Sequence, residues 1–353
     1  MSRLFPLLLG FTLSAGTTGC TSPAIVDAGA TGGDTSQRPA WPEPPAAERI
    51  RYLRQFGSPE DFAKHRNILQ RLASRLSGQK APNLVRPTGI AVVGSTVYVA
   101  DPGAAGFWIV DQQRGRFKLI QDAGAEALIS PVAVTLDGDQ NIYIADSALH
   151  KVLQYDDSGT FLGALSLDET ARPVGLAWSQ TGRKLYIADV AAHKIVMTDQ
   201  QGLLLRQFGG RGSDFGQFNF PTYLSLGGDN RLLVTDALNF RVQIFDTDGK
   251  FLSSFGHHGD GSGDFAAPKG LAMDSQQHIY VVDALFDAVQ IFDRSGEFLL
   301  SFGAQGTAPG EFWLPGGIFI TADDTIYVAD TYNRRIQVFT TVNPRQESRA
   351  GLR

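Results

Sequence analysis

Short apolar segments recur along the chain, and most of them do not alternate with polar residues. One such run, Ile279–Val282, ends at an aspartate, and five similar runs do the same: the six aspartates are Asp101, Asp146, Asp189, Asp236, Asp283 and Asp330. A proline lies about fifteen residues before each, at Pro87, Pro131, Pro173, Pro221, Pro268 and Pro315. Strands that are covered on both faces read as continuous apolar runs. The pattern therefore predicts one such buried strand in each of six repeats.

The spacing between the aspartates is 45, 43, 47, 47 and 47 residues. A period in the forties that is built from short strands is typical of a β-propeller, with one four-stranded sheet per repeat. In the fourth repeat, the segments that start at Tyr223, Arg231, Arg241 and Lys250 are rich in aromatic and β-branched residues and are separated by turns. We therefore predict an all-β fold, a six-bladed propeller of four-stranded blades.

The number of strands also predicts how the ring of blades closes. The last repeat stops after its third strand, which starts at Arg335, so its outer strand must come from elsewhere. Segment 49–57 resembles the outer strand of the third repeat, because both end in Arg-Gln-Phe-Gly. An N-terminal strand that completes the last blade leaves no unpaired edge at the closure. The predicted propeller spans residues 48–343, and we expect a disordered tail at 344–353.

One segment before the first repeat has a helical pattern. Ser58-Pro-Glu-Asp resembles a capping box with proline at the first helical position. Apolar residues at 62, 69, 72 and 76 share one face, and Gly78 ends the pattern. We predict a helix over residues 59–77 at the top rim, as packing or as a partial lid. The top is the face that carries the connections between blades and between second and third strands.

Several motifs of the later repeats resemble a known family. Three connections share one spacing and begin with Phe-Gly, at residues 208–218, 255–265 and 302–312. Two strands continue as Asp236-Ala-Leu-Asn-Phe-Arg-Val-Gln and Asp330-Thr-Tyr-Asn-Arg-Arg-Ile-Gln. These motifs are similar to NHL repeats. The resemblance implies a six-bladed propeller and leaves the function open, because this superfamily includes RNA-binding, protein-binding and enzymatic members.

The N-terminus predicts export. Arg3 precedes an apolar stretch and small residues that lead to Cys20, the only cysteine, which indicates a signal peptide at 1–19. Gly19-Cys20 resembles a bacterial lipoprotein cleavage site, whose cysteine is lipidated; ordinary secretion with a free thiol is the alternative. Residues 20–47 are rich in Ala, Gly, Thr, Ser and Pro, so we expect a flexible tether. The predicted location is the periplasmic side of the bacterial envelope, anchored to the outer membrane.

Positions that differ between repeats are the candidates for binding. The six repeated aspartates are expected to cap local turns through backbone hydrogen bonds, because they occur in every repeat. The residue four positions after each aspartate varies and lies on the top face, as do the residues around each proline. The candidate binding residues are Arg86, His150, Arg172, His193, Tyr223, Lys269 and Asp287.

Two of these candidates suggest a metal as an alternative. His150 and His193 lie at the same register of adjacent blades, and Asp146-Ser-Ala-Leu-His resembles the zinc-ligand segment of peptidylglycine amidating lyases. This resemblance implies a metal-dependent lyase or hydrolase with zinc on both histidines. Catalytic zinc needs three protein ligands, and no third histidine occurs at an equivalent position. The simpler interpretation is that the two histidines are solvated variants of the repeat.

The charge of the chain argues against nucleic acid as a partner. The sequence holds 31 basic and 36 acidic residues, and no basic stripe marks a surface that would bind a phosphate backbone. We therefore favour a non-catalytic, envelope-tethered binding scaffold without a cofactor over an enzyme. Its top face would recognise a protein, a polysaccharide or a small ligand, its lipid anchor would bind the membrane, and the domain would be monomeric.

Overall fold

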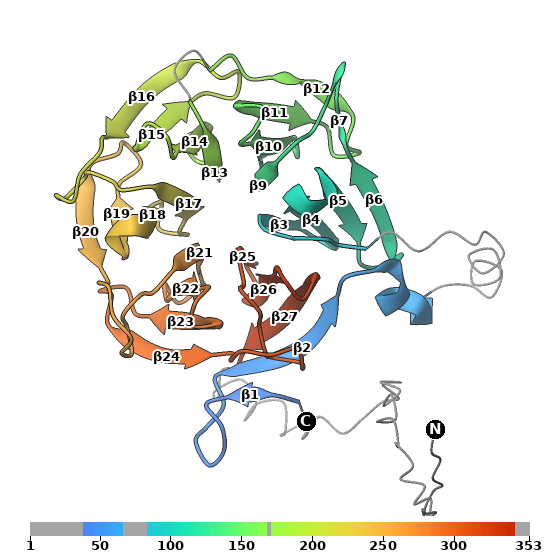
Figure 1. The fold of residues 1–353 in the computed structure, drawn as a ribbon, viewed down its shortest axis with the longest axis vertical. Coiled ribbons are helices and arrows are strands. Elements are labelled where there is room, and N and C mark those ends of the chain that lie inside the picture. Colours follow the sequence, from blue (N-terminus) through green and yellow to red (C-terminus); the bar gives the residue numbers. More distant parts are fainter. Residues whose placement is uncertain (1–37, 66–82, 168–170, 343–353) are drawn as a thin grey trace, which may run out of the picture. The chain divides into compact units, whose positions relative to one another are not determined.

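The computed structural model describes residues 38–65, 83–167 and 171–342, all of which belong to one compact unit, Arg38–Arg353. Six antiparallel sheets surround a common axis, with their first strands innermost (Figure 1). This arrangement confirms the predicted all-β, six-bladed propeller of four-stranded blades. Within the described ranges, no helix is both long and apolar enough to cross a membrane.

In blades one to five, the four strands follow one another along the chain, from the innermost to the outermost. Blade one contains β3 (Ile90–Val93), β4 (Thr96–Asp101), β5 (Gly106–Asp111) and β6 (Arg116–Ile120). Blade two contains β9 (Pro131–Leu136), β10 (Ile142–Asp146), β11 (Lys151–Tyr155) and β12 (Phe161–Ala164). Blade three contains β13 (Pro173–Ser179), β14 (Lys184–Asp189), β15 (Lys194–Thr198) and β16 (Leu204–Gly209). The connection between blades one and two includes a hairpin of β7 (Asp122–Ala123) and β8 (Glu126–Ala127).

The second half of the ring repeats this order. Blade four contains β17 (Pro221–Leu226), β18 (Leu232–Asp236), β19 (Arg241–Phe245) and β20 (Phe251–Phe255). Blade five contains β21 (Pro268–Met273), β22 (Ile279–Asp283), β23 (Ala288–Phe292) and β24 (Phe298–Phe302). Blade six contains β25 (Ile318–Ile320), β26 (Thr325–Asp330) and β27 (Arg335–Thr341). Short 3₁₀ turns, η3 (Pro102–Ala104) and η4 (Ala237–Asn239), follow the second strands of blades one and four.

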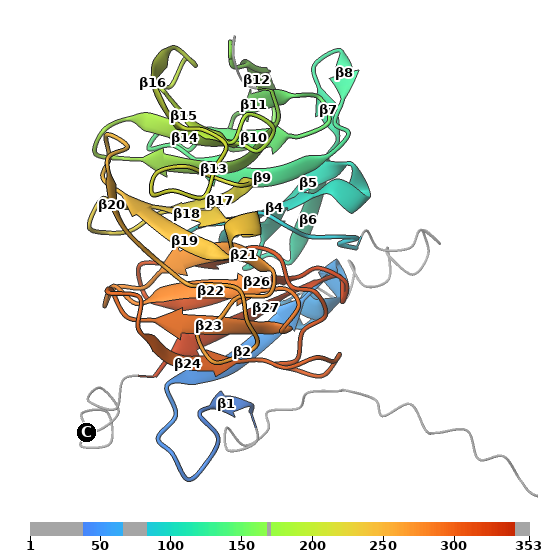
Figure 2. The ribbon, with the colours of Figure 1, turned by 60° about the vertical axis from the view of Figure 1, so that its left-hand side comes forward.

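The outer strand of blade six comes from the N-terminal side of the chain, as predicted. Strand β2 (Ile50–Phe56) pairs antiparallel with β27, and both views show the two strands side by side (Figure 1 and Figure 2). A fifth strand, β1 (Ala40–Trp41), pairs outside β2, so residues 38–47 extend the propeller beyond the predicted boundary at residue 48. The Trp41 ring lies 5.7 Å from that of Phe302, which anchors this extension to blade five.

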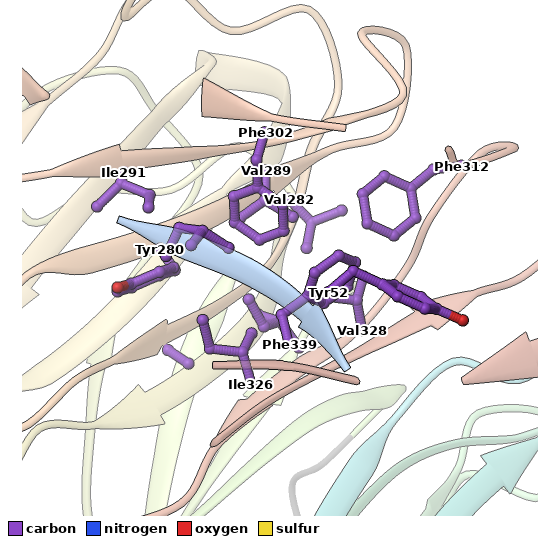
Figure 3. Packing of buried hydrophobic residues seen from close by; sticks show 13 residues of the cluster. Tyr52, Tyr280, Val282, Val289, Ile291, Phe302, Phe312, Ile326, Val328 and Phe339 are labelled. Atoms are coloured by element: carbon purple, nitrogen blue, oxygen red, sulfur yellow. The ribbon is translucent and has the colours of Figure 1, made fainter. Parts of the chain in front are cut away.

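The hydrophobic core lies between blades, and each cluster joins two neighbours. Figure 3 shows one cluster, in which side chains of β22, β23 and β24 meet those of β26, β27 and β2. Tyr52 from β2 packs edge-on against Phe339 from β27, with ring centroids 5.7 Å apart. Because central strands are covered on both faces, their residues need not alternate between apolar and polar. This explains the continuous runs in the sequence.

The predicted helix is only partly as expected. Residues Pro59–His65 form a 3₁₀ helix, η2, with a break at Phe62 instead of the start of a regular α-helix, and predicted residues 66–77 lie outside the described residues. Asp61 accepts hydrogen bonds from the backbone N–H groups of Gly57 and Ser58, both at 2.8 Å, which tightens the turn. Phe62 is buried against Phe56 and Phe117, so η2 packs on the outer strand of blade one.

Candidate functional site

The six repeated aspartates are fully buried, and their contacts agree with a local structural role. In blade one, Asp101 accepts hydrogen bonds from the backbone N–H groups of Val85 (2.7 Å) and Arg86 (2.8 Å), just before the first strand. The same carboxylate accepts from the N–H of Ala104 in the turn after the second strand, at 3.0 Å. The aspartates of blades two, three and five bind equivalent pairs of N–H groups. Each one therefore joins the turn to the start of its blade.

Blades four and six add an arginine to this arrangement. In blade six, Arg335 donates from Nε to Asp330 Oδ2 at 2.7 Å. Its remaining N–H groups reach the side chain of Gln55 in β2 and three backbone carbonyls of the connection between blades five and six, those of Thr307, Ala308 and Glu311. In blade four, Arg241 and Asp236 make the corresponding contacts. The motif that resembles NHL repeats therefore holds the connections between blades.

Two predicted binding residues support neighbouring blades. In Asp236 and Asp330, Oδ2 accepts hydrogen bonds from side chains, such as that of the arginine. Only Oδ1 is left for the backbone, and it binds one of the two N–H groups before the first strand. The preceding blade supplies an acceptor for the other group. His193 Nδ1 accepts from Phe220 at 3.2 Å, and Asp287 Oδ1 accepts from Leu314 at 2.6 Å.

Both donor residues have an unusual backbone conformation. Phe220 has φ of 60° and Leu314 has φ of 45°, which is the left-handed region that non-glycine residues rarely adopt. His193 and Asp287 are themselves buried. Burial, followed by the nearby Asp330 and Asp283, raises the pKa of the Asp287 carboxyl. The two side chains thus connect blade three to four and blade five to six, and a ligand would have little access to either.

His150 is the third predicted residue at this register. Its side chain is exposed, and Nδ1 contacts the carbonyl oxygen of Ala171 in blade three. Among the residues that the structure describes, no group of three or more His, Cys, Asp or Glu side chains is arranged to hold a metal ion. Like His193, His150 thus contacts a backbone group of the next blade, and within the described chain the two histidines are not part of a metal-binding group.

Replacing His193 is expected to weaken the fold. His193→Ala leaves the partly buried N–H of Phe220 without its acceptor, and the loss of such a hydrogen bond costs about 1 kcal/mol in unfolding free energy. His150→Ala, at an exposed position, should change that free energy by less than about 0.5 kcal/mol. Urea unfolding of the two variants makes the comparison. Equal losses would contradict the structural role of His193, and stoichiometric zinc that is lost with both variants would instead support the metal site.

Tyr223 lies in the central channel. The first strands of all six blades line a cavity of about 220 Å³. Four other repeats have glycine at the position of Tyr223. At Gly175, for example, there is no room for a side chain, because a Cβ would lie 2.2 Å from the carbonyl oxygen of Thr222. The Tyr223 hydroxyl reaches across to blade six, 3.6 Å from where a Cβ on Gly316 would stand. Burial raises the pKa of this hydroxyl to about 12. Tyr223 therefore narrows the channel.

The three predicted basic residues come from alternate blades. Arg86 and Arg172 are exposed beside the prolines of blades one and three, and Lys269 is half-buried beside the proline of blade five. Within the described part of the chain, neither Arg172 nor Lys269 has an ion-pair partner. The guanidinium of Arg86 lies 5.8 Å from the ring centroid of Tyr332. These three cations are available to a ligand on the top face.

The structure adds an exposed apolar surface that the sequence analysis missed. Six large apolar side chains lie just before first strands or in the turns after second strands, all on the top face. We call this set the apolar patch: Ile129, Phe220, Leu238, Leu285, Trp313 and Tyr332. Trp313 and Tyr332 are 46% and 44% exposed, with ring centroids 5.7 Å apart. The sequence does contain a signal for this patch, namely a large apolar residue at a position where another repeat has a small one. Trp313, for example, occupies the position that Ala171 has in blade three.

Comparisons with known proteins agree with the fold. A family model described as a 6-bladed beta-propeller matches residues 226–289 and 273–348. No curated protein matches the sequence. Virginiamycin B lyase from Staphylococcus aureus is 17% identical with a TM-score of 0.55, and the match covers 73% of this chain and 96% of the lyase.

Two solved structures from Bacteroides have higher TM-scores. A protein of unknown function from Bacteroides thetaiotaomicron is 17% identical with a TM-score of 0.60, covering 73% of this chain and 70% of the other. An auxiliary nutrient binding protein from Bacteroides ovatus is 12% identical with a TM-score of 0.58, covering 74% and 70%. At these identities the likeness concerns the fold alone. The finer assignment to NHL repeats stays a prediction.

Proposed function

We propose that this protein is a non-catalytic binding scaffold of the bacterial envelope and that the top face of its propeller recognises the partner. The apolar patch is the observation that carries this proposal. Six of the fourteen large apolar side chains that are exposed among the described residues lie on this one face, and exposed apolar patches often mark interaction sites. Three cations lie on the same face. The other candidates there, His193, Asp287 and Tyr223, have contacts that stabilise the ring and its channel.

The similar structures include a lyase and a nutrient binding protein, so the fold alone does not choose between catalysis and binding. Binding is supported by the engagement of both histidines with backbone groups of the next blade. It is also supported by the kind of side chain exposed on the top face, which is apolar or cationic. A protein or polymer partner fits such a surface better than a small substrate does.

The proposed location rests on residues outside the described part of the chain. The signal peptide at 1–19 and the lipidation of Cys20 would attach the protein to the outer membrane, facing the periplasm. The chain up to Gln37 would then act as the tether. Cell fractionation tests this proposal, because processed Cys20→Ser protein should leave the membrane fraction. Retention of that variant in the membrane would rule out the lipid anchor.

Removing the top-face cations should weaken partner capture without unfolding the protein. The test variant combines Arg86→Ala, Arg172→Ala and Lys269→Ala. A matched control combines Arg116→Ala, Arg206→Ala and Lys250→Ala, which removes the same charge from exposed positions on or next to outer strands. We expect each set to change the unfolding free energy by no more than about 1 kcal/mol, since surface charges contribute little. Only the top-face set should lose its partners.

The measurement is affinity capture from solubilised envelopes, with both variants and the native protein compared at equal load. Thermal melts of the same samples show that all three are folded. If the control set loses the partners and the top-face set keeps them, the top face is not the binding surface. Trp313→Ala alone, with all charges kept, provides a second test through the apolar patch that is independent of charge.

A further inference from the structure

Among the described residues beside the six prolines and in the turns after the second strands, the charged side chains that reach the surface are basic, although the chain as a whole has a net charge of −5. The acidic groups at the ends of the second strands and in the turns after them are the six strand-end aspartates and Asp287, all of them buried and bound to backbone N–H groups. The exposed acidic side chains Asp122, Asp214 and Asp260 belong instead to the connections between blades. The inner surface therefore presents cations to a partner.

Apolar and cationic side chains share this inner surface in a mixed pattern. The basic residues belong to blades one, three and five, and the apolar patch is drawn from blades two, four, five and six. A partner that covers the surface would meet both kinds of side chain within a short distance. Complementarity then requires negative charge and apolar groups on the same ligand.

We propose that the occupant is an acidic polypeptide segment that carries large apolar side chains. This inference rests on the proposed function and specifies its ligand. Ile129, Leu238 and Leu285 are aliphatic, so they have no aromatic face on which a sugar ring could stack, and they pack best against apolar side chains. An acidic polysaccharide would engage the cations and leave these three side chains in water. The observations thus favour a polypeptide over a polysaccharide.

Trp313, Tyr332 and Arg86 form the anchor of this site. Their residue types dominate the binding energy of protein interfaces. The two rings lie 5.7 Å apart at 41°, and the Arg86 guanidinium lies over Tyr332, so the group is ordered before the ligand arrives. Such ordering reduces the entropy that binding loses. Trp313 should therefore contribute most to the affinity.

Selection from a phage-displayed library of random twelve-residue peptides on the mature protein tests the inference. We expect enriched peptides to combine Asp or Glu with Leu, Ile, Phe or Trp. Fluorescence anisotropy with the most enriched peptide should then show at least about tenfold weaker binding to Trp313→Ala, as expected for an interface anchor. Leu205→Ala, at an exposed apolar position on β16, is the matched control and should bind as the native protein does.

Charge is tested with the same peptide. Binding should weaken by about tenfold or more in the variant with Arg86→Ala, Arg172→Ala and Lys269→Ala, and remain unchanged in the Arg116, Arg206 and Lys250 control. Raising the ionic strength from about 0.05 M to about 0.5 M should weaken binding to the native protein and have much less effect on the top-face variant. A neutral peptide with the same apolar residues should bind the native protein about as weakly as the acidic peptide binds the top-face variant.

Other outcomes would overturn the inference in distinguishable ways. Enrichment of basic or purely polar peptides, or of none, would exclude an acidic polypeptide. If a glycan array then reveals an acidic polysaccharide whose binding depends on Trp313, the scaffold function stands and only the proposed ligand is wrong. If peptides and envelope partners bind the top-face variants as well as the native protein, both the ligand and the proposed binding surface are wrong.

Discussion

A chain that begins at residue 58, and so lacks β2, is expected to lose cooperative unfolding and to aggregate. Strand β2 buries Ile50, Tyr52 and Phe56 against neighbouring blades. Each such side chain contributes about 2–5 kcal/mol. Their sum is comparable with the whole net stability of a folded protein, about 5–15 kcal/mol. The truncation also exposes β27 as an unpaired edge, which promotes association between chains. Urea unfolding and size-exclusion chromatography measure both effects.

A chain that begins at residue 48 is the matched control. It keeps β2 and loses only β1 and the loop before β2, whose main contact with the core is the half-buried Trp41. We expect it to fold cooperatively with an unfolding free energy lower by no more than about 3 kcal/mol, because Trp41 is only partly buried. A cooperative transition of equal midpoint in both truncated chains would show that β2 is not needed to close the ring.

Arg335→Ala is expected to cost about 3–5 kcal/mol in unfolding free energy. The substitution leaves Asp330 as a buried carboxylate without its cation, which is the strongly destabilising way to break a buried ion pair. It also removes the donors for three backbone carbonyls between blades five and six. Arg335→Lys should recover only part of the loss, since a single ammonium group cannot match the planar guanidinium.

The neighbouring residue supplies the control. Arg334 has the same chemistry but is exposed, so Arg334→Ala should change the unfolding free energy by less than about 0.5 kcal/mol. Both variants are compared by urea unfolding at one pH. Similar losses for the two would mean that the buried network does not stabilise the connection between the blades. An additional Asp330→Asn substitution, which removes the unpaired charge, should restore part of the stability lost in Arg335→Ala.

The fold could be predicted from the sequence because each blade is a local unit. Strand, turn and strand follow one another within a repeat, so the spacing of Asp and Pro was enough to count blades. The closing strand was recognisable because the Arg-Gln-Phe that ends β2 is followed by Gly57, which repeats the Arg-Gln-Phe-Gly of β16. The helix prediction was only partly correct because the conformation of this segment depends on contacts with residues that are distant in the sequence. Its pattern is local, yet the burial of Phe62 by Phe117 in blade one cannot be read from nearby residues.

The candidate site divides in the same way. Topology derived from the sequence was sufficient to assign Arg86, Arg172 and Lys269 to the top face, because each proline lies at or shortly before the start of a first strand there. The roles of His193 and Asp287 depend on the next blade, where Arg241 and Arg335 occupy a carboxylate oxygen and leave one N–H group without an acceptor. Exposure of Trp313 and Tyr332 is also a property of the assembled ring.

The sequence by itself thus determined the number of blades, the closure and the face on which variation concentrates, because these follow from repeated local hydrogen bonding and burial. Only the tertiary structure decided which varied side chains support the ring and which stay exposed. That choice depends on contacts between residues some 27 positions apart, such as His193 with Phe220 and Asp287 with Leu314. Contacts of this kind form only when neighbouring blades pack, and no pattern within one repeat contains them.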